Sequence, residues 1–168
     1  VASHDGLGDL ASALNVMAAE LKNTLQRLEE EGRRSRTIME NMGEGLLVLD
    51  ANGKITLLNP AAEKLFGLDR GAVLGQTPLE VIRSHELDDL IRAAARTDTG
   101  TAAEIVLAFP RRRTLAGTAV AMRDAAGGLQ GTVVALRDIT QIKRLEEIRM
   151  EFVLNVSHEL RTPLTAIR

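Results

Sequence analysis

From Gly45 to Leu58 the chain reads Gly-Leu-Leu-Val-Leu-Asp-Ala-Asn-Gly-Lys-Ile-Thr-Leu-Leu. Its first six residues form an apolar run of the kind that fills a buried strand, and a second such run covers Lys54–Leu58. Asn52 and Gly53 lie between the runs, and this dipeptide is typical of tight hairpins because it tolerates positive φ angles. The stretch therefore predicts two antiparallel strands joined by a short turn.

Short helices and three further strands are expected after this hairpin. Asn59 and Pro60 end the second strand, and Pro60 suits the first position of a helix that Gly67 ends. The expected helical segments are Ala61–Phe66, Arg70–Leu74 and Leu87–Arg96. The expected strands are Thr101–Phe109, Thr114–Arg123 and Gly131–Arg137. Two strands, several short helices and then three strands predict an α+β fold with an antiparallel sheet.

Upstream of the hairpin, residues 5–31 carry an apolar seam with alternating spacings of four and three. The seam consists of Leu10, Leu14, Met17, Leu21, Thr24 and Leu28. Such heptads are typical of paired helices, and three of them are marginal alone, so we expect a partner helix. The pattern also fits an amphipathic helix packed inside a globular domain. Gly32 costs a helix up to about 1 kcal/mol relative to Ala, and we expect a weak point there.

The composition excludes several classes of function. The 168 residues carry 21 basic and 23 acidic side chains, so the net charge of −2 gives no sign of a nucleic-acid surface. The absence of Cys excludes disulfides and thiolate metal sites. No run approaches the roughly 18 apolar residues that cross a bilayer, and no signal peptide opens the chain. Because Val1 is not preceded by Met, we expect the chain to be a piece of a longer protein.

Residues 149–164 predict an amphipathic helix. At about 100° per residue, one sector collects the apolar side chains Leu145, Ile148, Phe152, Val153, Val156, Leu160 and Leu164. His158 lies on the opposite side, Glu159 follows it, and Thr162 lies one turn further on the His158 side. Pro163 removes an amide donor, so a bend is expected there. This pattern alone is compatible with an ordinary solvated histidine. It excludes a His-Glu-x-x-His zinc site, because Thr162 stands at the fifth position.

The segment Phe152–Leu164, Phe-Val-Leu-Asn-Val-Ser-His-Glu-Leu-Arg-Thr-Pro-Leu, resembles the phosphoacceptor box of sensor histidine kinases. The resemblance implies that His158 is the nucleophile that attacks the γ-phosphate of ATP and that Glu159 is the acid/base. It also implies that Thr162 positions water for dephosphorylation of a response regulator. The site would then be a phosphoryl acceptor and not a metal site.

The middle of the chain is similar to a PAS domain. The similarity rests on Met42–Leu46, Asp50–Ile55, Asn59–Glu63, Phe66-Gly67, Leu74-Gly75 and Asp138–Thr140. It implies a five-stranded antiparallel sheet with short helices. The junction Asp138–Gln141 would pass the signal from the last strand to the final helix, capped either by Asp138, with Gln141 reaching back, or by Thr140.

Residues 5–10 and 13–18, Asp-Gly-Leu-Gly-Asp-Leu and Ala-Leu-Asn-Val-Met-Ala, look like the start and second helix of a HAMP linker, a dimeric four-helix signal relay. That family usually has Glu where Gly6 stands. The three resemblances together imply a HAMP part and coiled-coil linker at 1–31, a PAS sensor domain at 32–138 and the first helix of a dimerisation and phosphoacceptor domain at 139–168.

These resemblances imply a membrane-anchored, homodimeric sensor histidine kinase of which this chain is a cytoplasmic portion at the bacterial inner membrane. Its partners would be a response regulator and an ATP-binding domain of the same or the partner chain, with ATP and Mg²⁺ in the parent protein. The chain lacks that ATP-binding domain, so we expect it to be inactive alone. The alternative is a PAS-based ligand sensor or dimerisation scaffold without phosphotransfer.

A ligand in the PAS domain has few sequence signals, and we expect neither a cofactor nor a metal in this chain. A flavin adduct would need a Cys, and the one candidate haem ligand, His85, lies in an apparent surface helix start. His85 stands beside Glu86, Asp88 and Asp89, which could hold a divalent cation or form a solvated acidic face. Residues 111–113, three arginines, could hold an anion, touch a lipid headgroup or form an exposed turn. The remaining interpretation is a packed apolar interior.

Overall fold

The computed structural model describes the backbone of residues 2–166 and the side chains of 5–164 and 166. The chain consists of two compact units, and the boundary between them lies between Asn41 and Met42. The expected outer limits of the terminal domains, residue 1 and residues 167–168, lie outside the described residues.

The first unit is a single helix, α1, from Ala2 to Asn41. It passes Gly32 without ending, because one exposed glycine costs little against the many intrahelical hydrogen bonds on either side. The amide of Asn41 donates to the carbonyl oxygen of Thr37 at 2.8 Å in the last turn. The predicted boundary between residues 31 and 32 therefore falls inside a continuous helix.

The second unit contains a five-stranded antiparallel sheet with the strand order β2-β1-β5-β4-β3. The strands are β1 (Gly45–Asp50), β2 (Ile55–Leu58), β3 (Thr101–Leu107), β4 (Arg113–Arg123) and β5 (Leu129–Asp138). The α+β class and the antiparallel sheet expected from the sequence are thereby confirmed. Because β5 lies between β1 and β4, the last strand is central, and the chain leaves the sheet from its middle.

The β1–β2 hairpin is held by the side chain of its first turn residue. Asp50 Oδ1 accepts from the backbone N–H of Asn52 at 2.8 Å and of Lys54 at 2.9 Å. Gly53 has a φ of 76°, a left-handed conformation that glycine adopts without strain. The residue types read from the sequence thus determine this turn locally.

Asn59 joins this hairpin to α2 (Pro60–Phe66), and its side chain is almost completely buried. Its Oδ1 accepts from the N–H of Leu46 at 2.8 Å and of Ala62 at 2.9 Å, while its Nδ2 donates to the carbonyl of Glu44 at 2.9 Å. One amide therefore caps a helix and fastens the start of β1. As expected, Pro60 is the first helical residue and Gly67 ends the helix with φ 65°.

Three further helices follow: α3 (Arg70–Val73), α4 (Pro78–Val81) and α5 (His85–Ala95). The helix α4 was not expected from the sequence, although Thr77 and Glu80 have the spacing of a capping box. The backbone N–H of Thr77 donates to Glu80 Oε2 at 2.8 Å, and this bond lowers the pKa of Glu80 below its ordinary value. The missed signal was the Thr-Pro-Leu-Glu sequence itself.

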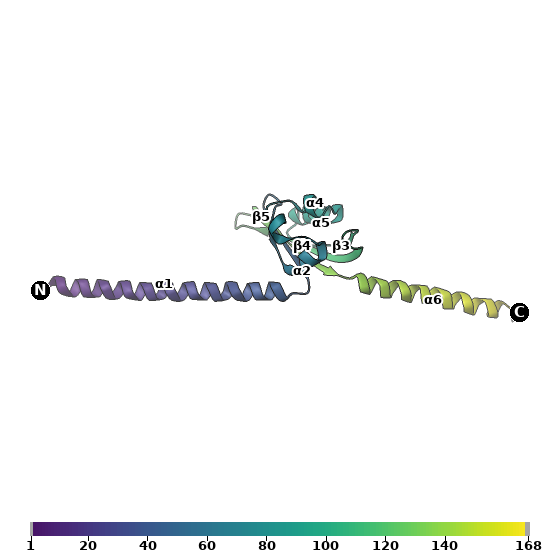
Figure 1. The fold of residues 1–168 in the computed structure, drawn as a ribbon, viewed down its shortest axis with the longest axis horizontal. Helices are drawn as coiled ribbons and strands as arrows, with labels where there is room; N and C mark the ends of the chain where they lie inside the picture. The colour runs from purple at the N-terminus through teal and green to yellow at the C-terminus, as the bar shows by residue number, and fades with distance from the viewer. Residues whose placement is uncertain (1, 167–168) are drawn as a thin grey trace. The chain divides into compact units, whose positions relative to one another are not determined.

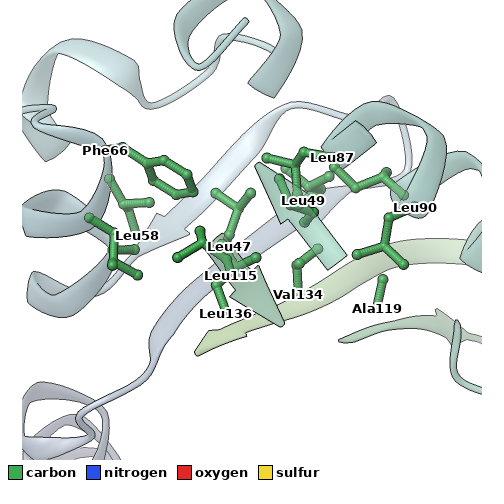
Figure 2. Close-up of a cluster of buried hydrophobic side chains, with 14 of the residues drawn as sticks. Leu47, Leu49, Leu58, Phe66, Leu87, Leu90, Leu115, Ala119, Val134 and Leu136 are labelled. Atoms are coloured by element: carbon green, nitrogen blue, oxygen red, sulfur yellow. The ribbon is translucent and has the colours of Figure 1, made fainter. Parts of the chain in front are cut away.

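Helices α2 and α5 pack against the sheet (Figure 1). The hydrophobic core lies between these helices and one face of the sheet. Figure 2 shows Leu47 of β1 near Leu136 of β5 and Leu49 of β1 near Leu87 of α5, with Phe66 of α2 in the same cluster. Gly117 on β4 leaves room for this packing. A Cβ there would lie 2.7 Å from Ile105 Cδ1 and 2.9 Å from Leu90 Cδ2, so the ends of these two side chains would have to shift to accept a larger residue.

Candidate functional site

The final helix, α6 (Thr140–Ala166), begins immediately after the central strand β5. Asp138 Oδ1 accepts from the backbone N–H of Thr140 at 3.0 Å and also from the Thr140 hydroxyl. Of the two caps that the sequence left open, the carboxylate of Asp138 is therefore the acceptor at the helix start. Its Oδ2 accepts from Arg113 Nη1 at 2.8 Å, which ties the start of α6 to β4.

Backbone bonds strengthen this junction. The N–H of Thr114 donates to Thr140 Oγ1 at 3.0 Å, and the N–H of Ile139 donates to the carbonyl of Thr114 at 2.9 Å. In the first turn of α6, Lys143 Nζ lies 2.6 Å from Glu104 Oε1 on the edge strand β3. The start of α6 is thus attached to two strands of the sheet.

Two ionisable groups at the junction carry shifted pKa values. Burial by itself would raise the pKa of Asp138, but the hydrogen bonds from Thr140 and Arg113 outweigh it and lower the pKa. The hydrogen bond to Glu104 raises the pKa of Lys143. Both shifts favour the charged forms, so the junction is held by charged pairs near neutral pH.

The residues that contact Asp138, Thr140 and Lys143 could not be predicted from the sequence. Asp138 and Thr140 were expected at the helix start, because capping residues act on neighbours in the chain. Arg113 is 25 residues from Asp138 in sequence, and Thr114 is 26 residues from Thr140. Nothing in the local pattern around Glu104 indicates a contact with Lys143, because strand pairing brings the two together.

His158 and Thr162 lie on the same side of α6, as the helical spacing predicted. Both lie on an open, shallow part of the helix surface together with Arg161 and Ala166. The hydroxyl of Thr162 donates to the backbone carbonyl of His158 at 3.3 Å, which keeps it one turn above the imidazole. Glu159 is exposed and follows His158 in the chain, but it is not among the residues of this surface. The imidazole is therefore open to an incoming reactant.

The opposite side of α6 is apolar and uncovered in the single chain. Its largest exposed side chains are Leu145, Ile148, Phe152, Val153, Leu160 and Leu164, each with more than half of its surface accessible. Val156 in the same sector is partly buried. The helix continues past Pro163 to Ala166, although proline cannot donate the usual bond to the carbonyl of Glu159.

The seam of α1 is uncovered in the same way. Leu10, Leu14, Met17, Leu21 and Leu28 are between 57% and 64% exposed. The hydroxyl of Thr24, the polar member of the seam, donates back to the carbonyl of Glu20 at 2.9 Å. Contact of a regular row of leucines with water is unfavourable, and exposed apolar rows of this kind are typical of surfaces that bind a partner.

The other candidate ligands occupy surface positions. His85 is exposed and is the first residue of α5, directly after the capping Ser84, as the sequence predicted. Within the described residues, no group of three or more His, Cys, Asp or Glu side chains is arranged to hold a metal ion. The same part of the chain contains no helix with the length and apolar character to span a membrane.

Comparison with known families now identifies the class of this protein. The family model described as the PAS fold matches residues 39–144, so the chain belongs to the PAS fold family. Two solved structures show the same fold. The PAS domain of an HTR-like protein from Haloarcula marismortui is 22% identical with a TM-score of 0.57, and the match covers 70% of this chain and 99% of that domain. The PAS domain of Bordetella pertussis BvgS is 24% identical with a TM-score of 0.54, and the match covers 76% of this chain and 98% of that domain.

Among curated proteins, the chain is similar to sensor protein kinases. WalK from Staphylococcus aureus strain Newman is 29% identical over 164 residues, and WalK from Staphylococcus epidermidis is 30% identical over 168 residues. Each alignment covers 98% of this chain but only 26% of the relative. This chain thus spans about a quarter of the length of these curated relatives. The similarity includes both flanking helices and extends well beyond the PAS fold.

Proposed function

We propose that this chain is the relay, sensor and phosphoacceptor portion of a homodimeric sensor histidine kinase. The observation that carries the proposal is the similarity to WalK across 98% of the chain, because a PAS fold alone matches only residues 39–144. The similarity therefore covers α6, where His158 is exposed on the side away from the apolar row.

In this proposal a ring nitrogen of His158 attacks the γ-phosphate of ATP. A nitrogen–phosphorus bond forms, the bond to the bridging oxygen breaks, and ADP leaves with the electron pair. Glu159 follows His158 in the chain and acts as the acid/base that orients the imidazole and takes up its proton. An ATP-binding domain of the same or the partner chain supplies ATP with Mg²⁺. The phosphoryl group then passes to an aspartate of a response regulator.

Thr162 has a separate role in the proposed reaction cycle, in which it positions water for the dephosphorylation of the response regulator. Its place one turn from His158 on the same side of α6 supports this role. A hydroxyl can both donate to and accept from a water molecule, which a methyl group cannot do.

The two uncovered helical faces support the dimer. In the proposed assembly the seam of α1 forms part of a HAMP-type four-helix relay, and the apolar side of α6 forms part of the dimerisation domain. The parent protein is anchored in the bacterial inner membrane, with this portion on the cytoplasmic side. The junction at Asp138 transmits the state of the sheet to α6 through its contacts with β4.

The direct test uses the chain extended through an ATP-binding domain and incubated with γ-labelled ATP and Mg²⁺. We expect acid-labile, base-stable phosphate in the wild type and none in His158→Gln. His85→Gln is the matched control, because His85 is also an exposed helical histidine. Label that persists in His158→Gln would overturn the assignment. Absence of label from every variant would favour the alternative, a PAS ligand sensor or dimerisation scaffold.

Thr162→Ala tests the phosphatase role separately. We expect autophosphorylation of His158 to stay near its wild-type rate, while dephosphorylation of the response regulator slows by about tenfold or more, as for loss of one positioned hydrogen bond. Both rates are measured on one preparation with labelled ATP and a prephosphorylated regulator. Equal loss of the two activities would show that Thr162 only supports the helix.

A further inference from the structure

Four arginines gather at the junction between the sheet and α6. Arg111 and Arg112 come from the β3–β4 loop, Arg113 begins β4, and Arg144 lies in the second turn of α6. All four line one open surface cavity of about 450 Å³, which is completed by Asp138, Thr140 and Gln141. The sequence showed a run of three arginines, but only the fold adds Arg144 to them.

The charges in this cavity do not balance. Asp138 provides the one carboxylate among the lining residues, and it is already bonded to Arg113 and Thr140. Arg111, Arg112 and Arg144 are exposed, and no ion pair in the described part of the chain includes them. In a protein with a net charge of −2, this cavity concentrates positive charge that an anion would relieve.

The donors suit a phosphate group. Guanidinium groups bind phosphate through two parallel N–H bonds and remain charged at any physiological pH. Arg113 uses Nη1 for Asp138, and a guanidinium has five N–H donors, so it retains capacity for a second acceptor. The lining thus offers one partly engaged and three unengaged guanidinium groups.

We propose that this arginine cluster binds a phosphate group, carried by a small soluble phosphate compound or by an anionic lipid headgroup. The bound phosphate links the β3–β4 loop to α6 and so adds to the contacts that hold the helix start. The site is separate from His158, which lies 14 residues beyond Arg144, or roughly 20 Å along the helix. The proposal therefore stands whether or not His158 is phosphorylated.

The test titrates the 168-residue chain with pyrophosphate at constant ionic strength and follows the arginine side-chain N–H signals by NMR. The cluster variant is Arg112→Gln with Arg144→Gln, which leaves the Arg113–Asp138 pair intact. The control is Arg36→Gln with Arg149→Gln, which removes the same charge from exposed helical positions. We expect affinity to fall by at least about tenfold in the cluster variant, as for loss of one charge-assisted bond, and to change less than twofold in the control.

A second arm separates the two sources of phosphate. Vesicles of phosphatidylglycerol are compared with vesicles of phosphatidylcholine in a sedimentation assay on the same variants. The proposal is supported if pyrophosphate, phosphatidylglycerol or both bind and this binding is lost only in the cluster variant. The probe that binds then identifies whether the phosphate comes from a soluble compound or from a lipid headgroup. If neither pyrophosphate nor phosphatidylglycerol binds, the proposal is overturned. Equal loss in the cluster and control variants also overturns it, because it would show attraction to net charge alone.

Discussion

Leucines in the sheet domain and leucines in the flanking helices have opposite environments. Leu47 of β1 and Leu136 of β5 are completely buried, whereas Leu14 of α1 and Leu145 of α6 expose 58% and 66% of their surface. Burial of such a side chain contributes about 1.5–3 kcal/mol, so the sheet domain obtains its stability within one chain. The exposed leucines of the helices contribute this stabilisation only when another surface covers them.

In the proposed sensor kinase, this difference would separate the part that responds to a signal from the part that reports it. The sheet has one interior that is closed by α2 and α5. The helices have exposed apolar rows that favour association. The contacts of Asp138, Thr140 and Lys143 lie where the two kinds of structure meet.

The largest effect is expected from truncation of the core. Leu47→Ala removes a fully buried side chain and should lower the free energy of unfolding of the sheet domain by about 2–5 kcal/mol. The free energy of unfolding is measured by urea denaturation monitored by circular dichroism. The matched change Leu145→Ala on the exposed side of α6 should alter the stability of the sheet domain by less than about 0.5 kcal/mol. Comparable losses would show that both leucines are buried in the functional state of the chain.

A smaller effect, on association rather than on folding, is expected from the seam of α1. Leu14→Asp with Leu21→Asp places charges where apolar contacts are proposed and should weaken self-association by at least about tenfold, or about 1.4 kcal/mol. Sedimentation equilibrium measures the change.

The matched control for the seam is Asn15→Asp with Gln26→Asp, which adds the same charge to exposed positions of α1 outside the seam. We expect it to leave self-association nearly unchanged. If the two double variants sediment alike, α1 does not pair through this row.

The smallest effect is expected at the junction. Asp138→Asn weakens the bond to Arg113 and the helix cap and should cost about 1 kcal/mol of stability near neutral pH. The pKa of Asp138 is lowered on folding, so its stabilising contribution is complete above the unfolded value of about 3.9. It is lost as the pH falls through the lower folded-state pKa.

Urea denaturation of wild type and Asp138→Asn at a series of pH values measures this contribution. The difference between them should be constant around neutrality and should shrink only under acidic conditions, below about pH 4. Asp89→Asn, on the exposed face of α5, is the control and should give a smaller difference. A difference that disappears near neutral pH would contradict the assigned direction of the pKa shift.

Much of the fold was predictable because its signals are local. The Asp50 turn, the Pro60 start of α2 and the Gly67 end of α2 all depend on residues within a few positions, and the structure confirms each of them. The strand limits differ from those expected by no more than two residues at either end. Gly32 shows the limit of a local signal, because a weak helix residue does not by itself end a long helix.

The sequence by itself determined the secondary elements, the hairpin, the α+β class and the placement of His158 opposite the apolar row of its helix. These features follow from side-chain periodicity and turn chemistry, which act between near neighbours. Only the tertiary structure decided that Arg113, Thr114 and Glu104 hold the start of α6, and that Arg144 joins the arginines of the β3–β4 loop. Those residues are distant in sequence, and strand pairing in the sheet is the physical interaction that brings them together.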